Sequence, residues 1–139
     1  MDERAAVLAA NAAFYRAFED LDLAAMEAVW LNAPYVKCVH PGWSLLTGFG
    51  PVMDSWQRIF ANTRGMHFEL ANILAEVVGD LAWVVLMEVI ETQTPEGIER
   101  GLVQATNIFQ RDGGRWLLIH HHGSPVYMPP SEAGPERMH

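Results

Sequence analysis

The sequence predicts an α+β fold, with three helices in the first half and a curved antiparallel sheet of about four long strands in the second. Apolar residues recur at helical spacing only in the first 62 residues, whereas residues 66–125 alternate in polarity or run apolar, as strands do. Turn residues interrupt this second half at Gly79-Asp80, Pro95-Glu96-Gly97 and Asp112-Gly113-Gly114. Short turns between strands predict a meander, and the preceding helices are expected to pack on its concave side.

Three segments predict the helices. Residues 3–18 are rich in alanine, residues 23–30 follow the potential N-cap Asp22, and residues 49–62 open with Gly50-Pro51, with proline in the favoured first turn. Each segment carries an apolar stripe that should face the sheet. The stripes consist of Val7, Leu8, Phe14, Tyr15 and Phe18 in the first helix, Met26, Val29 and Trp30 in the second, and Val52, Trp56, Ile59 and Phe60 in the third.

A turn-rich segment joins the second and third helices. Residues 35–40 alternate as a short strand that ends at Pro41-Gly42, and residues 43–46 are expected to form a second arm. We expect this segment to form a rim whose side chains, His40 and Trp43 among them, point into a cavity.

The long strands are predicted at residues 66–78, 81–92, 101–111 and 116–125. Residues 81–90 place apolar side chains on both faces, with Glu88 as the one carboxylate. A strand that is apolar on both sides is covered on both sides, here by helices on one face and by a partner subunit on the other. Because an unpaired charge is costly there, Glu88 is expected to be paired or protonated. A salt bridge across the subunit interface is the favoured interpretation, and a catalytic carboxylate with a raised pKa is the alternative.

The last strand ends with three consecutive histidines. Successive side chains point to opposite faces, so His120 and His122 share a face with Trp116, whereas His121 lies on the other. Adjacent strand residues cannot converge on one metal ion, so at most His120 and His122 could share a site, with a third ligand such as His40. Hydrogen-bonded pocket or interface histidines are therefore the favoured interpretation over a metal site.

The connection before this strand sets which histidines face the pocket. Asp112-Gly113-Gly114 forms a loop of either two or three residues, and the difference reverses the faces that the two strands share. With a two-residue loop, Asn107 and His120 lie on the same face. We expect the Trp116 face to be the inner one, with His120 and His122 in the pocket.

Composition limits the partners. The 139 residues carry a formal net charge of −8 and no basic cluster, which argues against nucleic acid and against a membrane surface as partners and favours an uncharged or cationic small molecule. Cys38 is the single cysteine, and no stretch has the pattern of a signal peptide or of a membrane span. We therefore expect a cytoplasmic protein with a single domain at residues 1–127 and a tail at residues 128–139.

Four segments resemble the SnoaL-like branch of the NTF2-like superfamily. They are Cys38-Val39-His40-Pro41-Gly42-Trp43, Ser55-Trp56, Ala105-Thr106-Asn107-Ile108-Phe109 and the strand from Trp116 to Pro125. The resemblance covers nearly the whole chain. It implies a cystatin-like cone, usually a homodimer that pairs through the outer sheet face, with a deep apolar pocket between sheet and helices. The superfamily includes isomerases, hydrolases, dehydratases and polyketide cyclases, so the fold does not name the reaction.

Ketosteroid isomerase gives the clearest comparison within that superfamily. Its general base, an aspartate before a proline on the rim strand, corresponds to His40 before Pro41. Its oxyanion donors, a tyrosine on the first helix and a protonated aspartate on the penultimate strand, correspond to Phe14, with Tyr15 beside it, and to Asn107. Asparagine can donate a hydrogen bond but phenylalanine cannot, which argues against steroid isomerisation by that mechanism. The Asp-Arg-Asp set of limonene epoxide hydrolase has no counterpart at matching positions.

These observations predict a homodimer that binds a small apolar or weakly polar molecule and requires no cofactor or metal. If the protein is catalytic, the reaction is a proton transfer (isomerisation, dehydration or cyclisation) with His40 as the base. Asn107, His120 and His122 are the expected polar partners in catalysis. The expected substrate contacts are Tyr15, Trp43, Trp56 and Glu88. Two alternatives stay open: a non-catalytic ligand-binding or dimerisation module, and a His40 that only holds its own turn in place.

Overall fold

The computed structural model describes residues 2–127, which form three helices and six strands. The predicted helices and long strands are confirmed, and the largest shift is at the third long strand, which begins at Gly97 instead of residue 101. The tail predicted at residues 128–139 lies outside the described residues. The elements are α1 (Glu3–Glu19), α2 (Leu23–Val29), β1 (Lys37–Val39), β2 (Leu46–Thr47), α3 (Phe49–Ala61), β3 (Met66–Val78), β4 (Leu81–Thr94), β5 (Gly97–Asp112) and β6 (Arg115–Pro125).

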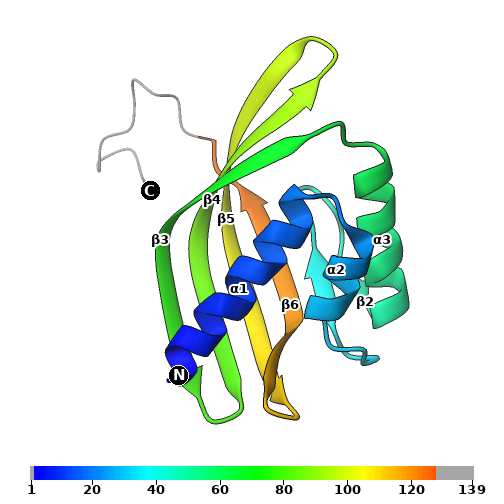
Figure 1. Ribbon diagram of the computed structural model, residues 1–139. Coiled ribbons are helices and arrows are strands. Elements are labelled where there is room, and N and C mark those ends of the chain that lie inside the picture. The colour runs from blue at the N-terminus through cyan, green and yellow to red at the C-terminus, as the bar shows by residue number, and fades with distance from the viewer. Residues whose placement is uncertain (1, 128–139) are drawn as a thin grey trace.

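All six strands belong to one mixed sheet in the order β2-β1-β6-β5-β4-β3. β3 to β6 form the predicted antiparallel meander, whereas the short strand β1 pairs with β6 in parallel and with β2 antiparallel at the sheet edge. α1 lies across the concave face, α2 packs against α1 and α3, α3 lies near β1 and β2, and the β4–β5 hairpin projects past the helices (Figure 1). The result is a curved, unclosed sheet with the helices on its concave face.

Local residue choice explains where elements begin and turn. Asp2 and Asp22 cap α1 and α2, and each side chain accepts a backbone N–H three residues further on. Gly113 and Gly114 have φ of 56° and 81°, the left-handed region that a two-residue hairpin loop requires at both positions.

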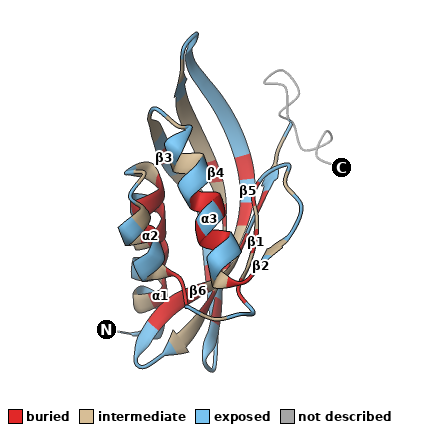
Figure 2. Ribbon diagram, turned by 90° about the vertical axis from the view of Figure 1, so that its right-hand side faces the viewer, coloured by how far each residue is buried: buried red, intermediate tan, exposed pale blue. Residues whose placement is uncertain are grey.

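The core lies between the helices and the concave face, where buried residues gather on the inward sides of the strands and of α3 (Figure 2). Phe14 lies at its centre and makes edge contacts with the rings of Tyr15, Phe18 and Trp56. The inward positions of the two central long strands are Ala82, Val84, Leu86 and Glu88 on β4, and Val103, Ala105, Asn107 and Phe109 on β5.

A bulge in β6 determines which histidine faces the core. The hairpin loop has two residues, yet the register shifts between Ile108 and Phe109, so that Ile119 is an extra residue of β6. Trp116 and Leu118 still point inward, but beyond the bulge His121 takes the inward position opposite Asn107. The prediction that His120 and His122 share the pocket face is therefore wrong, because one inserted residue reverses the alternation.

Within residues 2–127, no helix combines the length and the apolar character that crossing a membrane requires.

Candidate functional site

A buried chain of hydrogen bonds crosses the core from β4 to β6. Tyr15 on α1 donates its hydroxyl to Glu88 Oε2 at 2.5 Å, and the Asn107 amide donates to the Tyr15 hydroxyl at 3.2 Å. The same amide donates to Asn11 Oδ1 at 2.9 Å, and His121 Nδ1 lies 2.6 Å from Asn107 Oδ1. All five side chains are at most 4% exposed. We refer to Glu88, Tyr15, Asn107, Asn11 and His121 as the polar chain.

The polar chain has a defined direction. Asn107 Oδ1 can only accept, so His121 must carry its proton on Nδ1, which leaves Nε2 as an acceptor. The Asn107 amide is a donor to Asn11 and Tyr15, and Tyr15 passes the donation on to Glu88. Protonation of Glu88 at one end is therefore linked to the hydrogen bonds of His121 at the other.

His40 forms a second buried group on the rim side of the core. Its Nε2 lies 2.8 Å from Ser55 Oγ, and Ser55 donates its one hydroxyl proton to the Val52 carbonyl at 2.6 Å. Ser55 must then accept from His40, so the His40 proton is on Nε2. The Cys38 thiol lies beside the ring, with Sγ 3.6 Å from Nε2 and 3.9 Å from Nδ1. The side chain thus bonds α3 instead of the backbone of its own turn.

His40 and His121 approach each other in the core. Their ring centroids are 6.4 Å apart, and the Trp56 ring lies 4.7 Å from His40 and 5.9 Å from His121. Trp56 and Phe14 are fully buried, and the indole Nε1 of Trp56 has no hydrogen-bond partner within residues 2–127. One imidazole from the rim, His40, and one from the last strand therefore lie close together in the core. The residue of the last strand is His121, not His120 or His122, and Trp56 packs against both rings.

Burial sets the protonation of these groups. It raises the pKa of Glu88 to about 7, because the apolar surroundings disfavour the carboxylate more than the Tyr15 hydrogen bond favours it. Burial, together with the nearby Glu88 charge, also raises the pKa of Tyr15 well above its ordinary value. Burial lowers the pKa of His40 to about 4, and burial with neighbouring imidazoles lowers the pKa of His121 to about 3. At neutral pH both imidazoles are therefore neutral, whereas the pKa of Glu88 lies close to the ambient pH.

The position of Glu88 corrects the favoured sequence interpretation. Glu88 points into the concave interior, is 2% exposed and bonds Tyr15, so it does not form a salt bridge on the outer, interface face of the sheet. Tyr15 likewise replaces Phe14 as the side chain of α1 that faces Asn107, so the donor that the ketosteroid isomerase comparison lacked is present one residue further along the helix.

An open hollow of about 370 Å³ lies on the concave side. Two of its lining residues adjoin Glu88: Val103 is the cross-strand neighbour of Glu88, and Ile90 is the next inward residue of β4. Glu88 itself is 2% exposed and is not a lining residue. Pro41 forms the opposite wall and packs against Gly123, where an added Cβ would lie 3.2 Å from the proline ring. We refer to it as the concave hollow; its lining residues are Pro41, Ile90, Thr92, Glu99, Arg100, Gly101 and Val103.

Trp43 covers His40 from outside. Its ring lies edge-on at 4.9 Å from His40, and the Arg58 guanidinium lies 5.7 Å from the indole ring. Trp43 and Arg58 also line a surface hollow of about 260 Å³ on the α3 side. The predicted substrate contacts thus separate: Tyr15, Trp56 and Glu88 lie in the core, whereas Trp43 lies at the rim.

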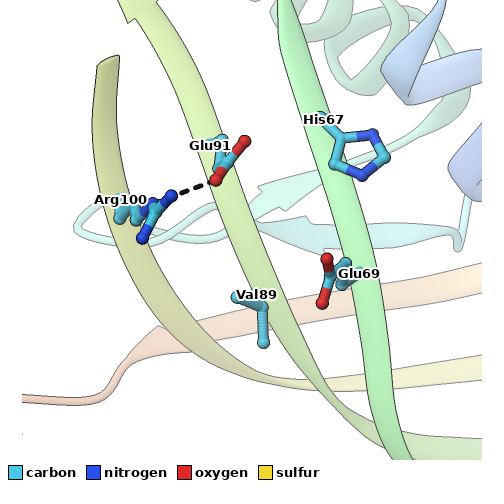
Figure 3. A pocket seen from close by; sticks show the side chains of 5 residues that line it. All are labelled: His67, Glu69, Val89, Glu91 and Arg100. Carbon is cyan, nitrogen blue, oxygen red and sulfur yellow. Dashed lines mark ion pairs between the residues drawn. The ribbon is translucent and has the colours of Figure 1, made fainter.

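A further hollow, of about 190 Å³, lies on the outer face of β3, β4 and β5 (Figure 3). Arg100 pairs with Glu91 at 2.9 Å, and His67 and Glu69 line the same hollow with Val89. His67 is also paired with Glu19 at the end of α1, at 3.0 Å. The sheet separates this charged hollow from the polar chain, so the two are distinct features.

Three members of the site were missed from the sequence: His121, Asn11 and Ser55. Asn11 carried a signal, since it lies four residues before Tyr15 and so falls on the same face of α1. His121 had none, because the bulge that turns it inward has no glycine or proline to mark it. Within residues 2–127, no group of three or more histidine, cysteine, aspartate or glutamate side chains is arranged to hold a metal ion.

Comparison with solved structures identifies the same architecture in other proteins. A putative dehydratase from the NTF2-like family of Streptomyces avermitilis is 38% identical, with a TM-score of 0.86 over 91% of this chain and 97% of that one. A putative calcium/calmodulin-dependent protein kinase type II association domain from Thiobacillus denitrificans is 30% identical, with a TM-score of 0.78 over 86% and 94%. A ketosteroid isomerase-like protein from Erwinia carotovora atroseptica shares the fold at 18% identity, with a TM-score of 0.74 over 91% and 98%.

Sequence comparison points the same way. The F-box protein SKIP8 of Arabidopsis thaliana is 33% identical over 119 residues, which are 86% of this chain and 49% of that protein. The chain therefore spans about half the length of this relative. The profile of the SnoaL-like domain family matches residues 7–128. Because this match covers nearly all of the chain and the cone is that of NTF2-like proteins, the chain belongs to the SnoaL-like domain family of the NTF2-like superfamily.

Proposed function

We propose that this SnoaL-like domain binds a small apolar or weakly polar molecule in the concave hollow and transfers a proton through Glu88. The observation that carries the proposal is a buried carboxyl group with a pKa of about 7, hydrogen-bonded to Tyr15 at 2.5 Å, whose cross-strand neighbour Val103 lines an open hollow. A general acid–base group is most effective when its pKa lies near the working pH.

The surroundings of the hollow support an apolar ligand. Pro41, Ile90 and Val103 offer hydrocarbon walls, Glu99 and Arg100 add charged groups, and Glu88 is the cross-strand neighbour of Val103. Glu88 is already shielded from water, which would strengthen its interactions with a ligand that reaches it from the hollow.

The remaining members of the polar chain have supporting roles in this proposal. Tyr15 holds one carboxyl oxygen of Glu88, and Asn107 holds the Tyr15 hydroxyl in place. We assign Glu88, instead of the predicted His40, as the main base, because a pKa of about 4 makes the His40 imidazole a weak proton acceptor. His120 and His122 have no part in this site, since they lie on the other face of the sheet.

Isomerisation, dehydration and cyclisation can each begin with removal of a proton from a carbon next to a carbonyl group. The relative that is 38% identical is named a putative dehydratase, which agrees with this reaction class. The test is to incubate the protein in D2O with a panel of small apolar ketones and β-hydroxy ketones and to follow deuterium uptake by mass spectrometry. Wild type should accelerate uptake for at least one member, and Glu88→Gln should abolish the acceleration.

A blocking variant tests the location of binding. Gly101 lines the hollow, and a Cβ added there meets nothing within 4 Å, so Gly101→Phe should fill the hollow without distorting the strand. Fluorescence of the neutral apolar dye N-phenyl-1-naphthylamine should rise with wild type and with Glu88→Gln but not with Gly101→Phe. Equal dye binding by all three proteins would argue against the hollow as the ligand site.

A second candidate function is self-association through the outer sheet face. Apolar side chains remain exposed there, including Leu74 at 64%, Val78 at 62% and Trp83 at 37%. The relative that is 30% identical is named an association domain, which supports a homodimer or larger assembly as a role of its own. The complete burial of Trp56 in the interior agrees with a structural function as well.

A further inference from the structure

His120 and His122 are alternate residues of β6 that point to the outer face of the sheet. Their ring centroids are 6.2 Å apart, and the ring planes are inclined by 40°. β6 lies between β1 and β5, so hydrogen-bonded ladders on both sides hold the backbone of the two residues. The spacing of this outer histidine pair is therefore set by the sheet.

The spacing is close to that of two imidazoles on one shared metal ion. A metal–nitrogen bond of about 2.1 Å places the centroid of an imidazole roughly 3.3 Å from the ion, so two rings on one ion have centroids roughly 4.7 Å apart at 90° and roughly 5.4 Å apart at the tetrahedral angle. The observed separation of 6.2 Å is about 1 Å wider than the tetrahedral value, a difference that small side-chain rotations can close. The hydrogen bonds and ion pairs of histidines within residues 2–127 involve His40, His67 and His121, which leaves both rings of the pair with nitrogens available.

We propose that His120 and His122 chelate one divalent transition-metal ion, such as Zn2+ or Ni2+. Neutral imidazole is a good ligand for these ions. Since residues 2–127 offer no group of three or more ligating side chains, the protein supplies two ligands and water supplies the rest. This site uses the face of the sheet opposite the polar chain, so it does not rest on the proposed proton transfer.

Some groups around the histidine pair favour metal binding and one, Lys37, opposes it. Burial lowers the pKa of His120, with smaller contributions from His122 and from Lys37, which favours the neutral ring that binds metal. Lys37 lies opposite His120 in the parallel β1–β6 ladder, and its ammonium group, which donates to the Tyr35 carbonyl at 3.1 Å, opposes a nearby cation. The protein as a whole carries a net charge of −8, which favours cation binding.

The other described histidines do not form an equivalent pair. His40 and His121 are buried, with Trp56 packed against both rings, and His67 is engaged by Glu19. The outer histidine pair is therefore the place, among residues 2–127, where two solvent-accessible imidazoles lie within reach of one ion.

Isothermal titration calorimetry with ZnCl2 and with NiCl2, without other ligands, tests the proposal on the full chain. Wild type should bind one ion per chain, or one per two chains where two copies share it. His120→Gln and His122→Gln should each weaken binding by about tenfold or more. The matched control is the double variant His67→Gln/His139→Gln, which should bind like wild type.

Two results would overturn the proposal: unchanged affinity in His120→Gln and His122→Gln, or loss of binding in the control variant. Ni2+ is paramagnetic, so two-dimensional NMR gives a second readout that does not depend on heat signals. Selective broadening of His120, His122 and the adjacent Thr106 and Ile108 resonances would support the site, and broadening centred on His67 would contradict it.

Discussion

Glu88 is a carboxyl group kept inside an apolar sheet face by one hydrogen bond. Its burial disfavours the charged form, and the 2.5 Å bond from Tyr15 partly offsets that cost, which leaves a pKa of about 7. A group in this state loses or gains its proton with small changes in pH or in its surroundings. For this reason the proposed proton transfer is assigned to Glu88 among the members of the polar chain.

The raised pKa of Glu88 makes stability depend on pH. The carboxyl ordinarily titrates at 4.5, so the folded state carries no penalty below that pH, and the penalty grows as the pH rises through about 7. Glu88→Gln mimics the protonated form and should gain roughly 3 kcal/mol of unfolding free energy relative to wild type between pH 4.5 and pH 8. Urea unfolding of both proteins across this range measures the difference.

The comparison with Glu88→Gln removes the effect of the buried histidines. The pKa values of His40 and His121 are lowered to about 4 and about 3, so their contribution is present above pH 6.5 and is lost as the pH falls through those values. Both proteins share this acid-side loss, and it cancels in the difference. A difference that stays constant with pH would show that Glu88 has an ordinary pKa.

Tyr15 is expected to stabilise the core through its hydroxyl. Tyr15→Phe removes the donor to Glu88 and the acceptor of Asn107, which should cost about 1–3 kcal/mol of unfolding free energy. The matched control is Tyr35→Phe, because the Tyr35 hydroxyl also bonds a side chain, Gln110, but is exposed. Chemical denaturation should show the loss for Tyr15→Phe alone, and equal losses would argue against a special role for the buried bond.

At the scale of elements, the close contact of β6 with the rim explains why Gly123 has no side chain. A Cβ there would lie 3.0 Å from Val103 Cγ1 and 3.2 Å from Pro41 Cγ, so Gly123→Ala should cost about 1–3 kcal/mol and disturb the wall of the concave hollow. Gly101→Ala is the control, because a Cβ at that strand position meets nothing within 4 Å. Thermal unfolding should separate the two variants, and a Gly123→Ala protein as stable as Gly101→Ala would contradict the packing described here.

The elements themselves could be predicted from the sequence because each depends on local signals. Asp22, Gly50-Pro51 and the Gly113-Gly114 loop mark ends and turns through caps, fixed φ or positive φ. The parallel pairing of β1 with β6 could not be predicted in this way, since it joins residues about 80 positions apart and depends on how the whole sheet curves.

The site could be predicted only in part for a related reason. His40 and Asn107 were identified and lie in the core. Which histidine of β6 faces the core beside them depends on one inserted residue, Ile119. A shift of one residue moves every following side chain to the opposite face of the strand. In β6 it places His121 on the inner face, where His120 was expected. Pairing and bulges depend on tertiary packing, which alternation in one segment does not reveal.

At the scale of the whole molecule, the sheet has one face covered by helices and one face that is not. The outer face carries exposed apolar side chains of β3 and β4, and pairing with a second copy would remove them from water. We expect a dimer in sedimentation velocity, and Trp83→Lys should shift it towards monomer because a lysine charge would be buried in the interface.

A control for this test lies on the rim loop before β2. Leu45 is 54% exposed but is not on the outer sheet face, so Leu45→Lys should leave the sedimentation coefficient unchanged. A monomeric wild type, or a dimer that tolerates Trp83→Lys as well as Leu45→Lys, would show that the outer face is not the surface of association.

The central claim is that Glu88 exchanges a proton near neutral pH inside the core. The direct measurement is an NMR titration of the Glu88 side-chain carboxyl carbon in protein labelled with 13C, with Glu88→Gln used to assign the signal. The structure leads us to expect a midpoint at about pH 7, well above the ordinary value of 4.5. A midpoint below about pH 5 would mean that the carboxyl is solvated or otherwise paired, and it would contradict the account of the site.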